Sequence, residues 1–153
     1  MTLRSESLDR ILDYAIAREI EASQFYTDLA AMMTTEAMKQ VFRDFAREEM
    51  GHKARLEDVK QGEYALDPPE MEIVGLGLAD YLVEAEPSPD MNYADALILA
   101  MKKEKAAYRL YMDMAVSLGS GELAEMFRAL AAEEARHKLR FEIEYDDVVL
   151  KED

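Results

Sequence analysis

Apolar residues recur along the chain at intervals that alternate between three and four, the spacing of residues on one face of an α-helix. Four stretches show this pattern, and good helix formers fill the positions between the apolar ones. The predicted helices lie near residues 5–33, 36–61, 92–118 and 121–147. We therefore expect an all-α protein in which each helix turns one apolar seam toward a shared core.

The breaks between these stretches indicate how the helices connect. Thr34 and Thr35 separate the first two helices and supply a cap for the second, and the segment 119–121 forms a similarly short turn between the last two. Short turns make each pair an antiparallel hairpin. The interval 63–91 contains all four prolines and, at roughly 3.3 Å per residue, can run the length of a bundle. The sequence predicts a four-helix bundle of two hairpins joined by this long crossover, with 73–85 as a candidate short helix outside it.

Polar residues interrupt the apolar seams near the middle of each helix. The first and third seams each carry one Glu, and the second and fourth each carry a Glu-x-x-His motif. The residues that stand where Leu or Ile is usual are Glu19, Glu49, His52, Glu104, Glu134 and His137. A Glu and a His three residues apart share one helix face, so both can meet one metal ion from the same side.

The two halves of the chain repeat each other at an offset of 85 residues. The segment FAREEMGHKARLE at 45–57 aligns with LAAEEARHKLRFE at 130–142, and the only two histidines occupy the same slot of the repeat. Tyr26 and Tyr111 are equivalent in the same way. A repeat of this size predicts two similar hairpins packed about a pseudo-twofold axis.

Burying four carboxylates at mid-bundle without compensation costs several kcal/mol per ion, on the order of magnitude found for buried charges. Two divalent metal ions balance four negative charges, and neutral histidines complete the ligand set. Carboxylate and imidazole ligands without thiolate suit iron or manganese, with zinc as a further candidate. The seams thus predict two metal ions, in the first place iron, at a site fit for redox chemistry with dioxygen or peroxide. The hydroxyls of Tyr26 and Tyr111 are placed to hydrogen-bond a ligand carboxylate from a neighbouring helix.

Composition and charge limit the kinds of site, partner and cellular location that the chain can have. The 153 residues suit a single domain with a sizeable core, and half of them are apolar. The absence of cysteine excludes disulfides, thiolate metal sites and iron–sulfur clusters. A formal net charge of −15 argues against nucleic acid and anionic membranes as partners. The first ten residues carry no apolar segment of a secretion signal, and no apolar run reaches membrane-spanning length, so we expect a cytoplasmic protein.

A further pair of repeated acidic residues, Glu48 and Glu133, lies four positions before each histidine. Their own helix faces run into Arg55 and Arg140, which is typical of a solvated surface. We expect these two carboxylates to face solvent, with a supporting role behind the metal ligands as the alternative.

The doubled pattern of Glu and Tyr seven residues apart, followed by Glu-x-x-His, resembles the ferritin-like di-iron carboxylate superfamily. Within it, the chain is similar to the rubrerythrin group and to small erythrin-like proteins, and the likeness covers all four helices. The resemblance implies a homodimer. It also implies that Glu49 and Glu134 bridge the two metal ions and that Glu19 and Glu104 are terminal carboxylate ligands. His52 and His137 would each bind one metal ion.

The chain departs from the rubrerythrin pattern in two respects. Rubrerythrins carry a further carboxylate three residues after the third-helix Glu, which serves when one iron moves with redox state. This chain has Ala107 there and Ala22 at the equivalent slot of the first helix. Full rubrerythrins also append a rubredoxin domain with four cysteines, and this chain has none. An electron donor, such as a rubredoxin-type protein, is therefore expected to be a separate protein.

The leading hypothesis is an enzyme, a non-haem di-iron oxidoreductase that reduces hydrogen peroxide or oxidises ferrous iron. Iron storage is the second hypothesis, although storage cages of the larger ferritin type need a fifth helix and only DDVVLKED follows Tyr145. Oxygenase chemistry on an organic substrate is a third. A partner-binding bundle whose metal site does no chemistry is the fourth.

Overall fold

The computed structural model describes residues 3–62 and 92–148, and every regular element within these two ranges is an α-helix. The helices are α1 (Leu3–Met32), α2 (Glu36–Lys60), α3 (Tyr93–Leu118) and α4 (Glu122–Val148). The predicted all-α class is confirmed, and each helix end lies within two residues of the range expected from the sequence. The crossover 63–91 and the candidate short helix at 73–85 lie outside the described residues.

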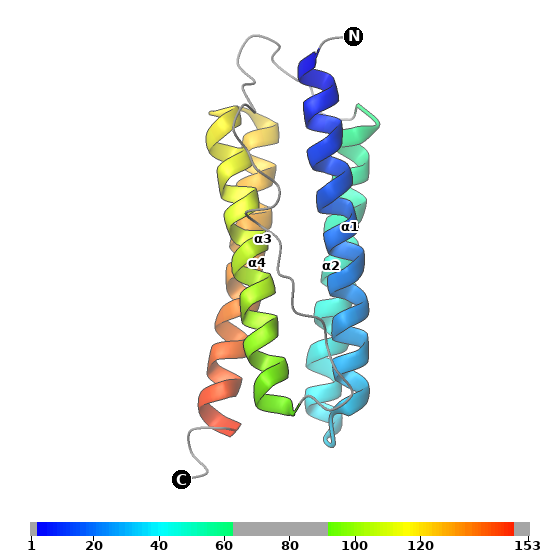
Figure 1. Cartoon of the computed structure of the whole chain (residues 1–153), viewed down its shortest axis with the longest axis vertical. Coiled ribbons are helices and arrows are strands. Elements are labelled where there is room, and N and C mark those ends of the chain that lie inside the picture. The colour runs from blue at the N-terminus through cyan, green and yellow to red at the C-terminus, as the bar shows by residue number, and fades with distance from the viewer. Residues whose placement is uncertain (1–2, 63–91, 149–153) are drawn as a thin grey trace.

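The four helices form two antiparallel hairpins, α1 with α2 and α3 with α4, that lie side by side (Figure 1). Side-chain contacts join α1 to α3 and α2 to α4 across the bundle. Helix α2 ends at one end of the bundle and α3 begins at the opposite end, so these two helices run in the same direction (Figure 1). This is the topology that a long connection between two hairpins requires, and it confirms the predicted four-helix bundle.

Short polar and glycine contacts define where the helices begin and end. The Thr35 hydroxyl accepts a hydrogen bond from the Met38 amide at the start of α2, and the Asn92 side chain accepts one from the Asp95 amide at the start of α3. Helix α3 ends at Gly119, where φ is 80°, a left-handed conformation that favours glycine.

Two apolar clusters fill the interior, one toward each end of the bundle, and the polar seam positions lie between them. The cluster near the start of α1 includes Leu12, Leu56, Met114 and Phe127. The cluster near the end of α1 includes Leu29, Phe42, Leu97 and Phe141. The six polar residues of the predicted seams are all buried. None of the four helices in the described ranges is long and apolar enough to cross a membrane.

Candidate metal centre

The structure brings together all six polar residues that interrupt the apolar seams. Each is at most 2 % exposed, and all four helices contribute: Glu19 from α1, Glu49 and His52 from α2, Glu104 from α3, and Glu134 and His137 from α4. They form two groups of four, in each of which the candidate ligand atoms lie within 4.8 Å of one another. The groups are Glu19, Glu49, His52 and Glu134, and Glu49, Glu104, Glu134 and His137. Because Glu49 and Glu134 belong to both, they lie between two candidate metal positions.

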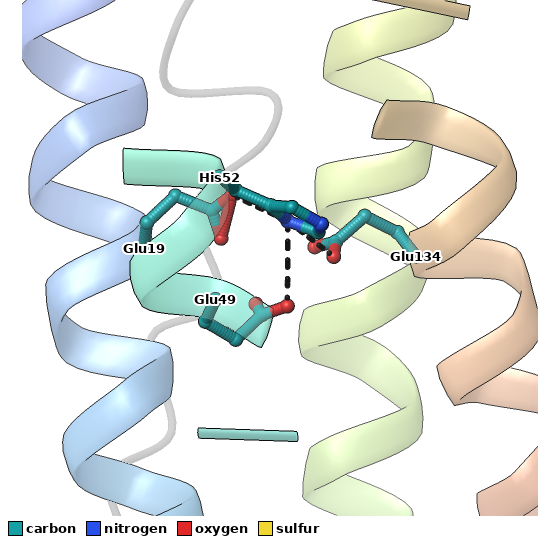
Figure 2. A group of neighbouring side chains, drawn as sticks. All are labelled: Glu19, Glu49, His52 and Glu134. Carbon is teal, nitrogen blue, oxygen red and sulfur yellow. Dashed lines mark hydrogen bonds and ion pairs between the residues drawn. The ribbon is translucent and has the colours of Figure 1, made fainter. Parts of the chain in front are cut away.

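The first group converges on Nδ1 of His52. This nitrogen lies 3.1 Å from Oε2 of Glu19 and 3.2 Å from Oε1 of Glu134. It lies 3.5 Å from Oε1 of Glu49, one turn earlier on the same helix. Figure 2 shows the three carboxylates approaching the imidazole from α1, α2 and α4. Three carboxylates from three helices therefore meet one imidazole nitrogen, and all four side chains are almost fully buried.

The second group mirrors the first around His137. Its Nδ1 lies 3.3 Å from Oε1 of Glu49 and 3.7 Å from Oε2 of Glu104. The two imidazole rings are nearly parallel, with 14° between their planes and 6.3 Å between their centroids. The two groups differ in their apolar neighbours. Phe45 stacks on the His137 ring, with 4.2 Å between the ring centroids, whereas the repeat places Leu130 at the position equivalent to Phe45. The two candidate metal positions thus have similar ligands and different apolar neighbours.

Two tyrosines link the hairpins through the carboxylates of α1 and α3. The Tyr111 hydroxyl donates to Oε2 of Glu19 at 2.8 Å, and the Tyr26 hydroxyl donates to Oε1 of Glu104. Both tyrosines are at most 1 % exposed. The prediction that each hydroxyl bonds a candidate ligand carboxylate from a neighbouring helix is confirmed.

The expectation that Glu48 and Glu133 face solvent is wrong. Glu48 is 34 % exposed and its Oε2 lies 3.1 Å from Nε2 of His137. Glu133 is 21 % exposed and its Oε1 lies 3.4 Å from Nε2 of His52. Each carboxylate therefore lies behind the histidine of the opposite hairpin, on the side away from the cluster. This geometry fits the alternative expectation, a supporting role behind the histidines.

Arginines hold these two outer carboxylates in place. Arg136 donates to Oε1 of Glu48 at 2.6 Å, and Arg55 donates to Oε2 of Glu133 at 2.9 Å. The sequence signal was present, since both acids are repeated at the same distance from a histidine. Arg55 and Arg140 on the same helix faces favour solvent instead, but in the structure Arg55 and Arg136 bridge α2 and α4 through these acids. A carboxylate that accepts the Nε2 proton leaves Nδ1 as the lone-pair donor to a metal.

The pKa values of the cluster reflect many like charges in a buried space. Burial, and then the charges of Glu134 and Glu104, raise the pKa of Glu49 well above its usual range. Burial and the same kind of repulsion raise the pKa of Glu134 to about 8, although His52 opposes this. For His52 burial lowers the pKa, but hydrogen bonds and charges from Glu134 and Glu19 outweigh it and raise the pKa to about 11. Without metal, the cluster therefore holds protons that its residues would release in water.

Several buried polar atoms of the six residues make no hydrogen bond in the described part of the chain. One of them is Nε2 of His52, on the outer side of that ring. The others are both oxygens of Glu49, Oε1 of Glu134, Oε2 of Glu104 and Nδ1 of His137. Buried polar atoms nearly always have a hydrogen-bond partner. Leaving such an atom without a hydrogen bond costs about 1–3 kcal/mol of stability, and more if the atom is charged. All but the His52 atom face the interior of the cluster, where the two groups of ligand atoms converge. The donor set therefore fits metal ions that prefer carboxylate and imidazole ligands.

Comparisons with known proteins agree with the fold. A family model described as a ferritin-like domain matches residues 8–142, which includes all six clustered residues. A solved structure of a hypothetical protein from Pyrococcus furiosus is 25 % identical, with a TM-score of 0.68 over 91 % of this chain and 88 % of that one. No curated protein matches the chain.

Proposed function

The chain belongs to the ferritin-like domain family, and on this basis we propose that it is a non-haem di-iron oxidoreductase that reacts with hydrogen peroxide or dioxygen, as a rubrerythrin-like peroxidase or ferroxidase. The observation that carries the proposal is the pair of overlapping ligand groups at mid-bundle, which share two carboxylates. A structural ion-pair cluster would match its acids with Lys or Arg, whereas these carboxylates face one another and the two histidines.

The arrangement suggests a division of roles among the six residues. Glu49 and Glu134 would hold both metal ions, since each lies in both groups. Glu19 and His52 would complete the ligands of one ion, and Glu104 and His137 would complete those of the other. When bound, a pair of ferrous ions supplies the two electrons that reduce one peroxide molecule, with two protons, to two molecules of water.

The surrounding residues position these ligands and restrict water. Tyr26 and Tyr111 hold the carboxylates of Glu104 and Glu19 by hydrogen bonds, which fixes their orientation in the absence of substrate. The two apolar clusters close the bundle on either side of the centre. Low solvent access strengthens every electrostatic interaction within the centre.

Zinc is disfavoured because redox chemistry with peroxide requires a metal that changes its charge, and zinc does not. Iron is proposed ahead of manganese on the resemblance to the di-iron proteins. Sustained turnover also needs an electron donor. The chain has no cysteine that could hold a rubredoxin-type iron, so we propose a separate donor protein. A homodimer is proposed from family resemblance.

Rapid mixing of the anaerobic, iron-loaded protein with hydrogen peroxide tests the proposed reaction. We expect oxidation of the iron within seconds, at about one peroxide per pair of ions, followed by absorption at near-ultraviolet wavelengths. A reduced protein that is unchanged by peroxide for minutes, while dioxygen oxidises it quickly, would support the ferroxidase reaction alone. Uptake of iron far above two ions per chain into a cage-sized particle would point instead to storage.

A further inference from the structure

A cavity of about 50 Å³ lies between α1 and α3 and leads to the candidate metal centre. Its inner wall is formed by the carboxylates of the centre, Glu19, Glu49, Glu104 and Glu134. Its outer wall includes Arg18, Lys103 and the exposed Glu21. The lining thus changes from fully buried carboxylates to partly exposed side chains, which makes this cavity a route between solvent and the centre.

Three alanines line the cavity, Ala22, Ala106 and Ala107, and two of them are equivalent in the repeat. Ala22 and Ala107 lie three positions after Glu19 and Glu104, and both line the cavity. They occupy equivalent positions of the internal repeat, so each hairpin leaves the same gap beside its own carboxylate. A longer side chain at either position would reach into the space beside the carboxylates.

The mouth of the cavity carries two cations and two unused polar atoms. Arg18 and Lys103 precede Glu19 and Glu104 and are also equivalent in the repeat. One nitrogen of Arg18 pairs with Glu21 at 2.6 Å, and its guanidinium lies 5.2 Å from the ring centroid of Tyr14. The Nε atom of Arg18 and the hydroxyl of Tyr14 have no hydrogen-bond partner in the described part of the chain.

These features limit what the cavity can take. A water molecule needs about 10–15 Å³ of such space and an engineered cavity of about 150 Å³ takes benzene, so this cavity suits a ligand of a few heavy atoms. Free N–H and O–H groups favour a ligand with a hydrogen-bond acceptor. The two cations favour a neutral or anionic ligand, in a protein whose net charge of −15 otherwise repels anions.

We propose that this cavity is the access route and binding pocket for the oxidant, a neutral or anionic oxygen species of hydrogen peroxide size. Arg18 and Lys103 attract and orient it, and Ala22 and Ala107 keep its path open. The inference rests on the proposed function, because it assumes that metal ions occupy the centre. It adds the side from which the oxidant arrives, between α1 and α3, and the residues that admit it.

Azide binding to the cobalt(II)-loaded protein tests the path without requiring catalysis, since azide is a small anion that changes the visible spectrum of cobalt. We expect the double variant Ala22→Leu with Ala107→Leu to weaken azide binding about tenfold or more, because the larger side chains fill the cavity. Cobalt should remain at two ions per chain. The matched control is Ala54→Leu, an exposed position on α2 whose repeat equivalent is already Leu139; it should bind azide normally.

A second double variant tests the role of the two cations at the mouth of the cavity and leaves the interior of the cavity unchanged. Arg18→Gln with Lys103→Gln should slow azide association about threefold to tenfold at low ionic strength, and added salt should shrink the difference. Lys102→Gln with Lys105→Gln removes the same charge from exposed positions on α3 and should have little effect.

The outcomes separate the two proposals. If cobalt binds at two ions per chain but neither double variant changes azide binding, the access route is wrong and the metal centre stands. If the unaltered protein takes up no cobalt, the proposed function is wrong and the access route fails with it. Reduced azide binding in both double variants and in neither control is the result that we expect.

Discussion

Each histidine of the centre is held from both sides. Its Nδ1 faces the carboxylate cluster and its Nε2 faces an outer carboxylate from the opposite hairpin. Such an outer partner fixes the ring orientation and the tautomer of a metal ligand. An arginine in turn donates a hydrogen bond to each outer acid, Arg136 to Glu48 and Arg55 to Glu133.

Replacing the outer acids should therefore weaken metal binding without removing a ligand. We expect Glu48→Gln and Glu133→Gln each to lower metal affinity about 10- to 100-fold, measured by competition with a coloured chelator. Glu142→Gln is the control, because Glu142 also pairs with a cation, Lys138, at 2.6 Å. Equal affinity for all three variants and the unaltered protein would show that the outer acids do not position the histidines.

The hydrogen bonds of the tyrosine hydroxyls lead to a separate prediction about stability. Tyr26→Phe and Tyr111→Phe keep the packing of the ring but leave a carboxylate oxygen of Glu104 or Glu19 without its donor. The free energy of unfolding of the metal-loaded protein should fall by about 1–3 kcal/mol in chemical denaturation. Tyr108→Phe, at a ring that is 37 % exposed, should change it by less than about 0.5 kcal/mol. Similar effects for all three would argue against structural hydrogen bonds.

The six clustered residues could be predicted from the sequence because an apolar seam faces the core of the bundle. A polar residue within the seam must therefore be buried at the bundle interior. The outer acids could not be placed in this way. Whether Glu48 faces solvent or His137 depends on how α2 is rotated and packed against α4. The periodicity of a single helix does not determine that rotation. The cavity between α1 and α3 depends on helix packing in the same way, although the sequence shows Ala22 and Ala107 as departures from the rubrerythrin pattern.

Among the helices, glycine has two opposite roles. Gly119 ends α3 with φ of 80°, and an added Cβ there would be strained by the backbone conformation itself. Gly51 lies exposed in the middle of α2, and a Cβ there would meet no heavy atom within 4 Å. The same substitution should therefore have opposite effects at the two positions.

We expect Gly119→Ala to lower the free energy of unfolding by about 1 kcal/mol, because alanine disfavours a positive φ. Gly51→Ala should raise it by about 0.5–1 kcal/mol, because glycine is the costlier residue inside a helix. Urea denaturation of the two variants measures both changes. A loss of stability at both positions would mean that Gly51 makes a contact that its open surroundings do not suggest.

The helix boundaries and the hairpin arrangement could be predicted because local signals mark them. Thr35 caps α2, and Gly119 ends α3 as the turn residues suggested. The order of the hairpins followed from connection lengths, since two tight turns and one long interval leave few topologies. Their contacts could not be predicted, because the tyrosines and the acid–arginine pairs that join them come from positions up to 92 residues apart.

For the molecule as a whole, the buried charges predict how stability depends on pH. The pKa of Glu134 is raised to about 8 and that of His52 to about 11 in the folded, metal-free protein. Since both values exceed those of the unfolded chain, the folded state binds more protons, and stability is lost as pH rises through the folded pKa values. The metal-free protein should therefore melt at a lower temperature at about pH 8.5 than at about pH 5.5.

Metal should reverse this dependence, because metal ions displace protons from the same ligands and bind more tightly as pH rises. Thermal unfolding with and without chelator, at the two pH values, measures both trends. A metal-free protein that becomes more stable toward alkaline pH would show that the six residues are not buried together as ions and protonated acids.

The number of ferrous ions retained per chain, after anaerobic loading and removal of free iron, tests whether the six buried residues form a two-metal centre. We predict two ions per chain, and a large loss in the double variant His52→Ala with His137→Ala, which removes one ligand from each group. Retention of two ions by that variant would contradict the assignment, and so would an unaltered protein that retains none.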